Sequence, residues 1–203
     1  MRFWRFVVLS GSVASLKLIK RGTPYLYVRP FQHNHFFQRY TVNTNSFSYP
    51  PMSPYLTVKD ANKAIEFYKT AFGATEIFRL ADGKSGAVSH AELMINGSHI
   101  MLADENPTWG NKSPLSLGGT AVSFSLMVEN ADAAAQRASA AGATVEMPPT
   151  DMFYGFRSAG IIDPFGHKWM LQHQIEKVAP DEMQKRWDAM VESGDTGCTN
   201  TDK

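Results

Sequence analysis

Apolar and polar residues alternate along several short runs after residue 52, and longer stretches with helical periodicity separate these runs. In the first run, Leu56 and Val58 alternate with Tyr55 and Thr57, which is the pattern of a strand with one buried face. The next stretch carries apolar residues at helical spacing: Ala61, Ala64, Ile65, Tyr68, Ala71 and Phe72. This stripe predicts a helix that packs on the strand and ends at Gly73.

Three further strands are predicted before residue 105. Turn signals lie between them at residues 81–86 and at Asn96-Gly97, so the runs are expected to be joined by hairpins. The predicted strands cover residues 74–80, 87–95 and 98–104.

The same order of elements returns in the second half of the chain. Residues 56–75, LTVKDANKAIEFYKTAFGAT, are repeated as residues 126–144, LMVENADAAAQRASAAGAT, so that Val58 corresponds to Val128. A repeat in two copies does not suit a solenoid and predicts instead two βαβββ modules that pair around one shared site. The second module is expected to have a strand at 121–128, a helix at 131–141, and strands at 143–147, 154–162 and 167–171.

These elements predict an α+β domain followed by a C-terminal segment. The domain covers residues 52–176, with modules at 53–105 and 120–175 and a linker at 106–119. Residues 177–203 contain a predicted helix over 181–191 and a polar tail. Four apolar residues share one face of this helix, and we expect that face to dock on its own domain or on a second subunit: Met183, Trp187, Met190 and Val191.

Residues 1–51 differ from the rest of the chain in charge. No Asp or Glu occurs before Asp60, while Lys and Arg contribute eight positive charges over the same stretch. A segment that contains Arg and Ser and lacks acids is typical of an organelle transit peptide, so we expect import into mitochondria, or alternatively into plastids. Two other interpretations stay open: a secretory signal, because Arg2 and Arg5 precede an apolar run, and a disordered leader on a cytoplasmic protein.

The composition gives no support to several classes of partner. The formal net charge of +1 provides no reason to expect nucleic acid, and no apolar run approaches the roughly 20 residues that span a membrane. The single cysteine, Cys198, lies in a polar tail, so we expect neither a disulfide framework nor a multi-cysteine metal site. No nucleophile–base pair, phosphate loop or dinucleotide motif is evident from the sequence.

Two strings of residues indicate a family. AIEFYKTAFGA at residues 64–74 and DPFGHKW at residues 163–169 resemble the vicinal oxygen chelate superfamily, in particular its glyoxalase, bleomycin-resistance and dioxygenase-like branch and the PhnB-like proteins. The resemblance covers residues 53–190. It implies a cup made of two four-stranded sheets, often completed by a homodimer, and we therefore expect a homodimer.

The resemblance also implies four ligand positions for a divalent metal, occupied in the metal-dependent members by His or Gln and by Glu. In this chain the four positions fall on poor ligands: Ser53, Ala103, Ser123 and Met170. We therefore expect this metal site to be absent and predict no cofactor. A shift of one residue would bring in Asp104 without replacing the other three, and a divalent metal at a non-standard site that includes His90 is the alternative.

Strand alternation predicts which side chains line the cup. Residues opposite to Leu56, Val58, Phe124, Leu126 and Val128 should form a mildly polar pocket for a small organic ligand. The predicted ligand-binding residues are Tyr55, Thr57, Ser123, Ser125 and Met127, with Trp169 and His173 from the last strand. His173 shares strand parity with Leu171, which points it toward the helices instead, and a packed barrel with nothing bound is the alternative.

His90, Tyr154 and Arg157 are the candidate catalytic residues. An imidazole such as that of His90 acts as a base, a hydrogen-bond donor or a metal ligand near neutral pH. Arg157 lacks the adjacent acid found in the proteins it resembles, so it either meets an anionic ligand or pairs with Asp151 or Asp163. His167 follows a tight turn and is expected to be solvated.

Two functions therefore remain open. The first is a protein that binds a small organic metabolite in its cup without catalysis. The second is a metal-dependent lyase, isomerase or dioxygenase-type enzyme that uses a non-standard metal site. Loss of the four ligands favours binding, whereas titratable groups near one edge favour catalysis, so the sequence does not decide whether the protein is an enzyme.

Overall fold

The computed structural model contains two units, residues 1–49 and 50–203, which we describe separately. It describes residues 5–9, 12–16, 25–28, 40–41 and 49–194. The first unit has a four-stranded antiparallel sheet of order β1-β2-β3-β4, with strands β1 Arg5–Leu9, β2 Ser12–Leu16, β3 Tyr25–Val28 and β4 Tyr40–Thr41. Most of the predicted transit peptide, and Cys198, lie outside the described residues, and import stays a prediction.

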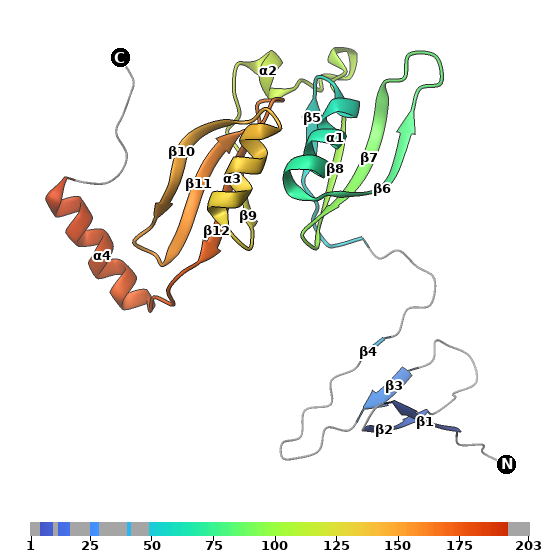
Figure 1. Ribbon diagram of the computed structural model, residues 1–203. Coiled ribbons are helices and arrows are strands. Elements are labelled where there is room, and N and C mark those ends of the chain that lie inside the picture. The colour runs from blue at the N-terminus through green and yellow to red at the C-terminus, as the bar shows by residue number, and fades with distance from the viewer. Residues whose placement is uncertain (1–4, 10–11, 17–24, 29–39, 42–48, 195–203) are drawn as a thin grey trace. The chain divides into compact units, whose positions relative to one another are not determined.

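The first βαβββ module forms a mixed sheet of order β5-β8-β7-β6, as Figure 1 shows. Its elements are β5 Tyr55–Val58, α1 Ala61–Phe72, β6 Thr75–Ala81, β7 Val88–Ile95 and β8 Ser98–Asp104. β5 and β8 pair in parallel, and the other pairs are antiparallel. Helix α1 ends as predicted at Gly73, whose φ of 68° is the left-handed conformation that glycine adopts without a Cβ penalty.

The second module repeats this topology in a sheet of order β10-β11-β12-β9. Its elements are β9 Ser123–Met127, α3 Ala131–Ala140, β10 Thr144–Asp151, β11 Phe156–Ile162 and β12 Lys168–Gln174. The predicted α+β fold with two similar modules is confirmed. β10 extends beyond its predicted end through Pro148 and Pro149, which an edge strand tolerates because it has no neighbour on one side.

The segment between the modules is not a plain linker. It contains the short helices η1 Pro107–Trp109 and α2 Pro114–Leu117, each with a polar N-cap followed by proline. After the second module, α4 Pro180–Ser193 starts and ends within two residues of the predicted helix. Trp187 of α4 contacts the ring of Phe153 at 5.5 Å between centroids, although 40% of Trp187 remains exposed.

One hydrophobic core joins the two modules. Figure 1 shows α1 and α3 on the same side of the two sheets, and buried residues of both modules belong to one cluster. Tyr68 of α1 lies 5.6 Å from Trp169 of β12 between ring centroids. Within residues 49–194, Figure 1 shows no helix on the other face of either sheet, and we call these two surfaces the open faces of the first and second module.

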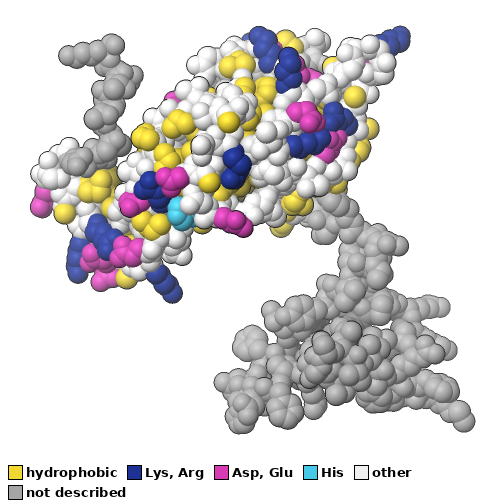
Figure 2. All heavy atoms as spheres, viewed as in Figure 1, with side chains coloured by type: hydrophobic (Ala, Val, Ile, Leu, Met, Phe, Trp, Pro, Cys, Tyr) yellow, Lys and Arg dark blue, Asp and Glu magenta, His cyan; other side chains and the backbone are white. Residues whose placement is uncertain are grey.

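The outer surface carries paired charges. Figure 2 shows acidic and basic side chains next to one another on the viewed face, in keeping with a net charge of +1. Within residues 49–194, no helix is long and apolar enough to cross a membrane.

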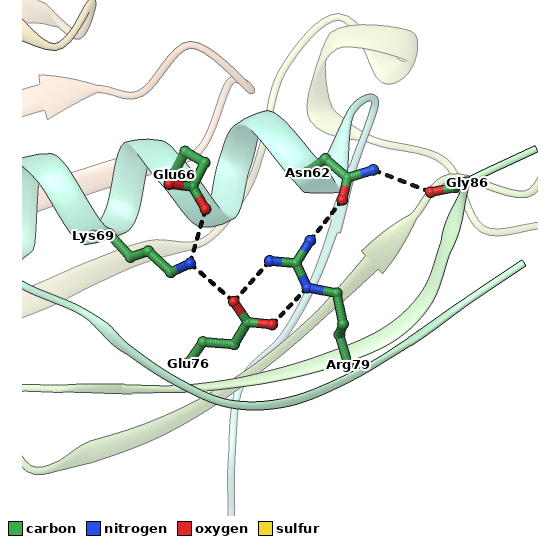
Figure 3. Close-up of polar contacts among 6 residues, drawn as sticks. All are labelled: Asn62, Glu66, Lys69, Glu76, Arg79 and Gly86. Atoms are coloured by element: carbon green, nitrogen blue, oxygen red, sulfur yellow. Dashed lines mark hydrogen bonds and ion pairs between the residues drawn. The ribbon is translucent and has the colours of Figure 1, made fainter. Parts of the chain in front are cut away.

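The largest charge network of the first module links α1 to β6 (Figure 3). Glu76 accepts hydrogen bonds from Arg79 at 2.5 and 2.7 Å and pairs with Lys69 at 2.9 Å. Arg79 also donates to the Asn62 side chain, which in turn donates to the carbonyl of Gly86. The hydrogen bonds from Arg79, followed by those from Lys69, lower the pKa of Glu76 from 4.5 to about 2.

This lowered pKa predicts a pH dependence of stability. A carboxyl with a lowered folded-state pKa stabilises the protein above its unfolded pKa, and that stability is lost as pH falls from 4.5 toward about 2. The melting temperature of the native protein should therefore fall more steeply below pH 4.5 than that of Glu76→Gln. Thermal unfolding of both proteins between neutral pH and pH ~3 measures the difference, and parallel curves would contradict the assignment.

Candidate functional site

The open face of the first module carries exposed aromatic and apolar groups around a polar centre. Leu56 and Val58 point toward α1 and are buried, which places Tyr55 and Thr57 on the open face as predicted. Tyr55, Phe78 and Leu80 are 52%, 41% and 54% exposed. These side chains form an apolar rim of the kind that surrounds small-molecule sites.

Five polar side chains on this face, including the Tyr55 hydroxyl at the rim, form a continuous hydrogen-bonded series, which we call the relay chain. The Ser53 hydroxyl lies 2.8 Å from Nδ1 of His99, and Nε2 of His99 lies 3.1 Å from Oε2 of Glu92. The other carboxylate oxygen, Oε1, lies 3.1 Å from Nε2 of His90, whose Nδ1 lies 3.0 Å from the Tyr55 hydroxyl. One carboxylate therefore connects two imidazoles, each of which reaches a hydroxyl.

The directions of these hydrogen bonds follow from the protonation states of the three ionisable groups. When Glu92 is ionised, its carboxylate only accepts, and Nε2 of both His90 and His99 then carries the N–H. In the neutral imidazole, Nδ1 of each ring is then an acceptor, and the hydroxyls of Ser53 and Tyr55 must donate to it. Partial burial raises the pKa of Tyr55, which keeps its hydroxyl protonated for this role.

Sheet register brings the relay chain together from separate strands. β7 and β8 are joined by a two-residue turn in which Asn96 and Gly97 have φ angles of 45° and 79°. The turn pairs Glu92 with Met101, which places Glu92 and His99 on the same face of adjacent strands. Glu92 and His99 are only 2% and 6% exposed, so their hydrogen bonds are shielded from water.

The second module has no equivalent of the relay chain at the matching positions. Ser123 corresponds to Ser53 in the repeat, but its partner in the sheet register is Lys168. The position that corresponds to Glu92 is Gly160, which pairs with Met170 as Glu92 pairs with Met101. The two open faces therefore have the same strand arrangement, but hydrogen-bonded imidazole and carboxylate groups occupy the matching positions only in the first module.

Neutral polar groups occupy the middle of the open face of the second module, and Lys168 lies at its end beside Ser123. Gln172 donates to the Ser125 hydroxyl at 2.6 Å, and the Ser158 hydroxyl lies 3.3 Å from the Gln172 side-chain oxygen. Tyr154 adds its hydroxyl 3.4 Å from that of Ser158. Of the predicted ligand-binding residues, Ser123, Ser125 and Met127 share this face, with Met127 45% exposed.

Two predicted ligand-binding residues lie on the other face of their strand. Trp169 is 4% exposed and donates from Nε1 to Asp163 in the core. His173 accepts a hydrogen bond from the backbone N–H of Ala131 at 3.0 Å and thus caps α3. Asp104 does the same for α1 by accepting from Ala61 at 2.7 Å, so His173 and Asp104 are structural counterparts. The assignment of Trp169 and His173 to the cup is therefore corrected.

Arg157 also lies on the helix side of its sheet. It forms a two-point ion pair with Asp132 of α3, at 2.7 and 2.8 Å, and a third contact with Asp151 at 2.7 Å. This placement matches the structural alternative and not the catalytic one, and it separates Arg157 from His90 and the relay chain. His167 was expected to be solvated, but it is only 7% exposed. Its Nε2 donates to the Thr57 carbonyl at 3.2 Å, and burial lowers the pKa of the imidazole.

The residues at the four family metal positions do not fit a divalent ion. Ala103 has no donor atom, Met170 offers only a thioether, and the Ser53 hydroxyl is engaged with His99. Within residues 49–194, no group of three or more His, Cys, Asp or Glu side chains is arranged to hold a metal. The nitrogens of His90, the predicted fallback ligand, both lie within hydrogen-bonding distance of protein groups.

A separate groove of about 680 Å³ lies on the helix side, between α1 and the turn at residues 163–166. Phe67, Leu115 and Phe165 provide its apolar lining. Two of its charged groups, Lys63 and Asp60, pair with each other at 2.8 Å. The groove contains no group of the relay chain, so we place the candidate site on the open face of the first module.

Comparisons with known proteins identify the family. Residues 49–171 match the family described as the Glyoxalase/Bleomycin resistance protein/Dioxygenase superfamily, and this match covers more than half of the chain. The chain belongs to this superfamily. The uncharacterized protein Mb0911c of Mycobacterium bovis is 46% identical to this superfamily member over 149 residues, which cover 72% of the chain and 95% of the relative.

Solved structures of the superfamily agree with the fold. The X-ray structure of the Arabidopsis thaliana gene product At5g48480 has a TM-score of 0.51 at 29% identity and covers 62% of this chain and 100% of its own. The fosfomycin resistance protein FosX of Listeria monocytogenes has a TM-score of 0.50 at 20% identity, covering 66% of this chain and 97% of its own. The latter similarity concerns the fold alone.

Sequence reasoning placed His90 in the site but missed Glu92 and His99, and it considered Ser53 only as a vacated metal position. The signal was present in the spacing. His90 and Glu92 are two residues apart in a strand, so they share a face, and the Asn96-Gly97 turn carries that face over to His99. The relay chain can be predicted if the alternation of side chains between the two faces is followed from β7 through the turn into β8, and not within β7 alone.

Proposed function

We propose that this protein binds a small organic compound on the open face of its first module, without the metal site of the superfamily's metal-dependent members. The relay chain is the observation that carries this proposal. A buried carboxylate and two imidazoles are costly to keep in a purely structural role, because each must be fully hydrogen-bonded. We further propose a homodimer that covers the open faces, since Tyr55, Phe78 and Leu80 remain exposed in the single chain.

The direction of the hydrogen bonds defines the class of ligand. Ser53 and Tyr55 donate their protons inward to the imidazoles, so they offer only oxygen lone pairs to a ligand. Glu92 adds a buried carboxyl group next to both imidazoles. A ligand that donates hydrogen bonds, such as an alcohol or an amine, therefore fits this face, whereas a carboxylate of similar shape does not.

A matched set of fragments tests this proposal. Benzyl alcohol, benzylamine and benzoate share one ring and differ in the polar group, and NMR chemical-shift changes in the labelled protein report where each one binds. We expect the alcohol and the amine to perturb resonances of Ser53, Tyr55 and Phe78, and benzoate to bind at least about tenfold more weakly, which corresponds to about 1.4 kcal/mol.

Two variants locate the effect. Tyr55→Phe removes one acceptor and should weaken the amine several-fold, in line with about 1 kcal/mol for one hydrogen bond. Ser125→Ala, which removes an acceptor from the open face of the second module, should leave the affinity unchanged. Preferential binding of benzoate, or shifts confined to other surfaces, would contradict the proposal.

A further inference from the structure

We propose that Ser53 is a nucleophile for acyl transfer, with His99 as its general base and Glu92 as the group that orients the base. The distances of 2.8 Å from Ser53 Oγ to His99 Nδ1 and 3.1 Å from His99 Nε2 to Glu92 lie in hydrogen-bonding range. A hydroxyl, a base within reach of it, and a third group that orients the base are the geometric signature of an activated nucleophile. The sequence gives no motif for it, because the three residues come from different segments.

The backbone holds Ser53 in place. Pro54 follows it directly, and a residue before proline is restricted to extended conformations. The Pro54 carbonyl accepts a hydrogen bond from the N–H of Met101 at 2.9 Å, which ties this segment to β8 two residues beyond His99. Nucleophile and base are therefore held side by side, Ser53 just before β5 and His99 in β8, which lowers the entropic cost of bringing them together.

The base is fixed as firmly as the nucleophile. Glu92 contacts both His99 and His90, so its carboxylate is held from two sides. The side chains of Glu92 and His99 are each 3% exposed. Burial strengthens the charge–charge interaction by which a carboxylate stabilises an imidazolium formed at His99, as in hydroxyl–imidazole–carboxylate sites on other folds.

The repeat supplies an internal comparison. Ser123 occupies the place of Ser53 in the second module, at the start of the equivalent strand, but the residue in register with it is Lys168. An ammonium group cannot accept a proton from a hydroxyl. The structure therefore predicts that Ser53 is reactive and Ser123 is not, although both lie on open faces.

The proposed substrate is a small carboxylic ester that also carries a hydroxyl or amino group, which donates a hydrogen bond to the Tyr55 oxygen as the proposed ligand class requires. Ser53 Oγ attacks the carbonyl carbon while its proton passes to His99 Nδ1, and the ester C–O bond then breaks. His99 returns that proton to the departing alcohol, which leaves an acyl group on Ser53. Water, deprotonated by His99, attacks this acyl group, the bond to Oγ breaks, and Oγ takes back the proton. The sum is ester plus water giving acid plus alcohol, without a cofactor.

The inference uses the same open face as the proposed function, but it does not require the fragments above to bind. A fluorophosphonate probe tests it in the full-length protein: Oγ displaces fluoride from phosphorus, the proton leaves with fluoride, and the serine keeps a phosphonyl group. We expect a single label, mapped to Ser53 by tandem mass spectrometry. The same protein should release 4-nitrophenol from 4-nitrophenyl acetate with an initial burst of acylation.

Matched variants separate the roles of the three residues. Ser53→Ala should lose the label and the burst, whereas Ser123→Ala should retain both. Glu92→Gln should slow labelling by at least about tenfold, because the base loses its orienting charge. Melting temperatures verify that each variant is folded.

A second route applies if Glu92→Gln does not fold. Ser53→Cys leaves His99 and Glu92 intact, and iodoacetamide should alkylate its thiol faster than the thiol of Ser123→Cys, as measured by peptide mass spectrometry. Equal rates, or a label that survives in Ser53→Ala, would overturn the inference while leaving fragment binding as evidence for the proposed function. A label at Ser53 without any fragment binding would refute the proposed function alone.

Discussion

Replacing Asp163 with alanine should lower the free energy of unfolding by about 3–5 kcal/mol, the range expected when a buried charged network loses one member. Asp163 is 3% exposed and accepts four hydrogen bonds. Two come from the backbone N–H groups of Phe165 and His167, both at 2.9 Å. The alanine variant leaves all four buried donors without their acceptor, and each unsatisfied group costs about 1–3 kcal/mol before relaxation.

The other two donors explain why the loss should affect the whole domain. The Tyr68 hydroxyl of α1 donates at 2.8 Å and Nε1 of Trp169 donates at 2.9 Å, so the same carboxylate joins the first module to the second. Burial, followed by the Asp163 charge, raises the pKa of Tyr68 well above its ordinary value, so its hydroxyl stays a donor. Loss of Asp163 therefore weakens both the turn at residues 163–166 and the packing of α1 on β12.

Urea unfolding of the native protein and the variant measures this difference. Asp151→Asn serves as the control, because Asp151 makes an exposed ion pair with Arg157 and exposed pairs contribute only about 0–1 kcal/mol. Tyr68→Phe removes a single donor and should cost about 1–2 kcal/mol. An Asp163→Ala variant with the stability of the Asp151 control would show that the four hydrogen bonds contribute little.

The alternation of apolar and polar residues predicted most of the fold, because it shows directly which side chains of a strand are buried and which are exposed. Leu56 and Val58 are buried and Tyr55 is exposed, as period two requires, and the helical stripe through Tyr68 faces the core. Because the second half of the chain repeats the first, the elements predicted for one module also predicted those of the other. The α+β fold and its two similar modules thus followed from short-range rules together with a family resemblance, whereas the order of the strands in each sheet was not predicted.

The site was harder to predict because it depends on pairing between strands. His173 and Trp169 were included in the cup, although their strand parity matches that of buried Leu171. Glu92 was not among the predicted site residues, and only the register of β7 with β8 shows that it lies buried next to His99. Side-chain alternation describes one strand, whereas a polar network needs the register of several.

The linker helices show a different limit. η1 and α2 are three and four residues long, so they have no apolar periodicity to detect. Their signals are the caps Asn106 and Ser113, each followed by proline. Glu105 holds the second cap by accepting hydrogen bonds from the backbone and hydroxyl of Ser113, an interaction that becomes visible only in three dimensions.

Gly155→Ala should destabilise the second module by about 2–4 kcal/mol, through backbone strain and a close approach together. Gly155 has a φ of +86°, in the left-handed region that side chains with a Cβ disfavour. A Cβ here would overlap the Glu176 carbonyl oxygen and lie 2.7 Å from Cγ2 of Val178. The surroundings cannot move away easily, because the Gly155 carbonyl accepts the backbone N–H groups of Ile175 and Glu176, both at 3.0 Å.

Gly110→Ala provides the matched control for this prediction. Gly110 has a similar φ of +78°, but a Cβ at that position meets no atom within 4 Å, so the substitution adds only the backbone cost of about 1–2 kcal/mol. The difference between the two variants in urea unfolding measures the close approach by itself. Equal losses would show that the chain after β12 moves freely away from the turn that contains Gly155. A larger loss at Gly155 would show that this turn and residues 175–178 are packed as one unit, which fixes the start of the segment leading to α4.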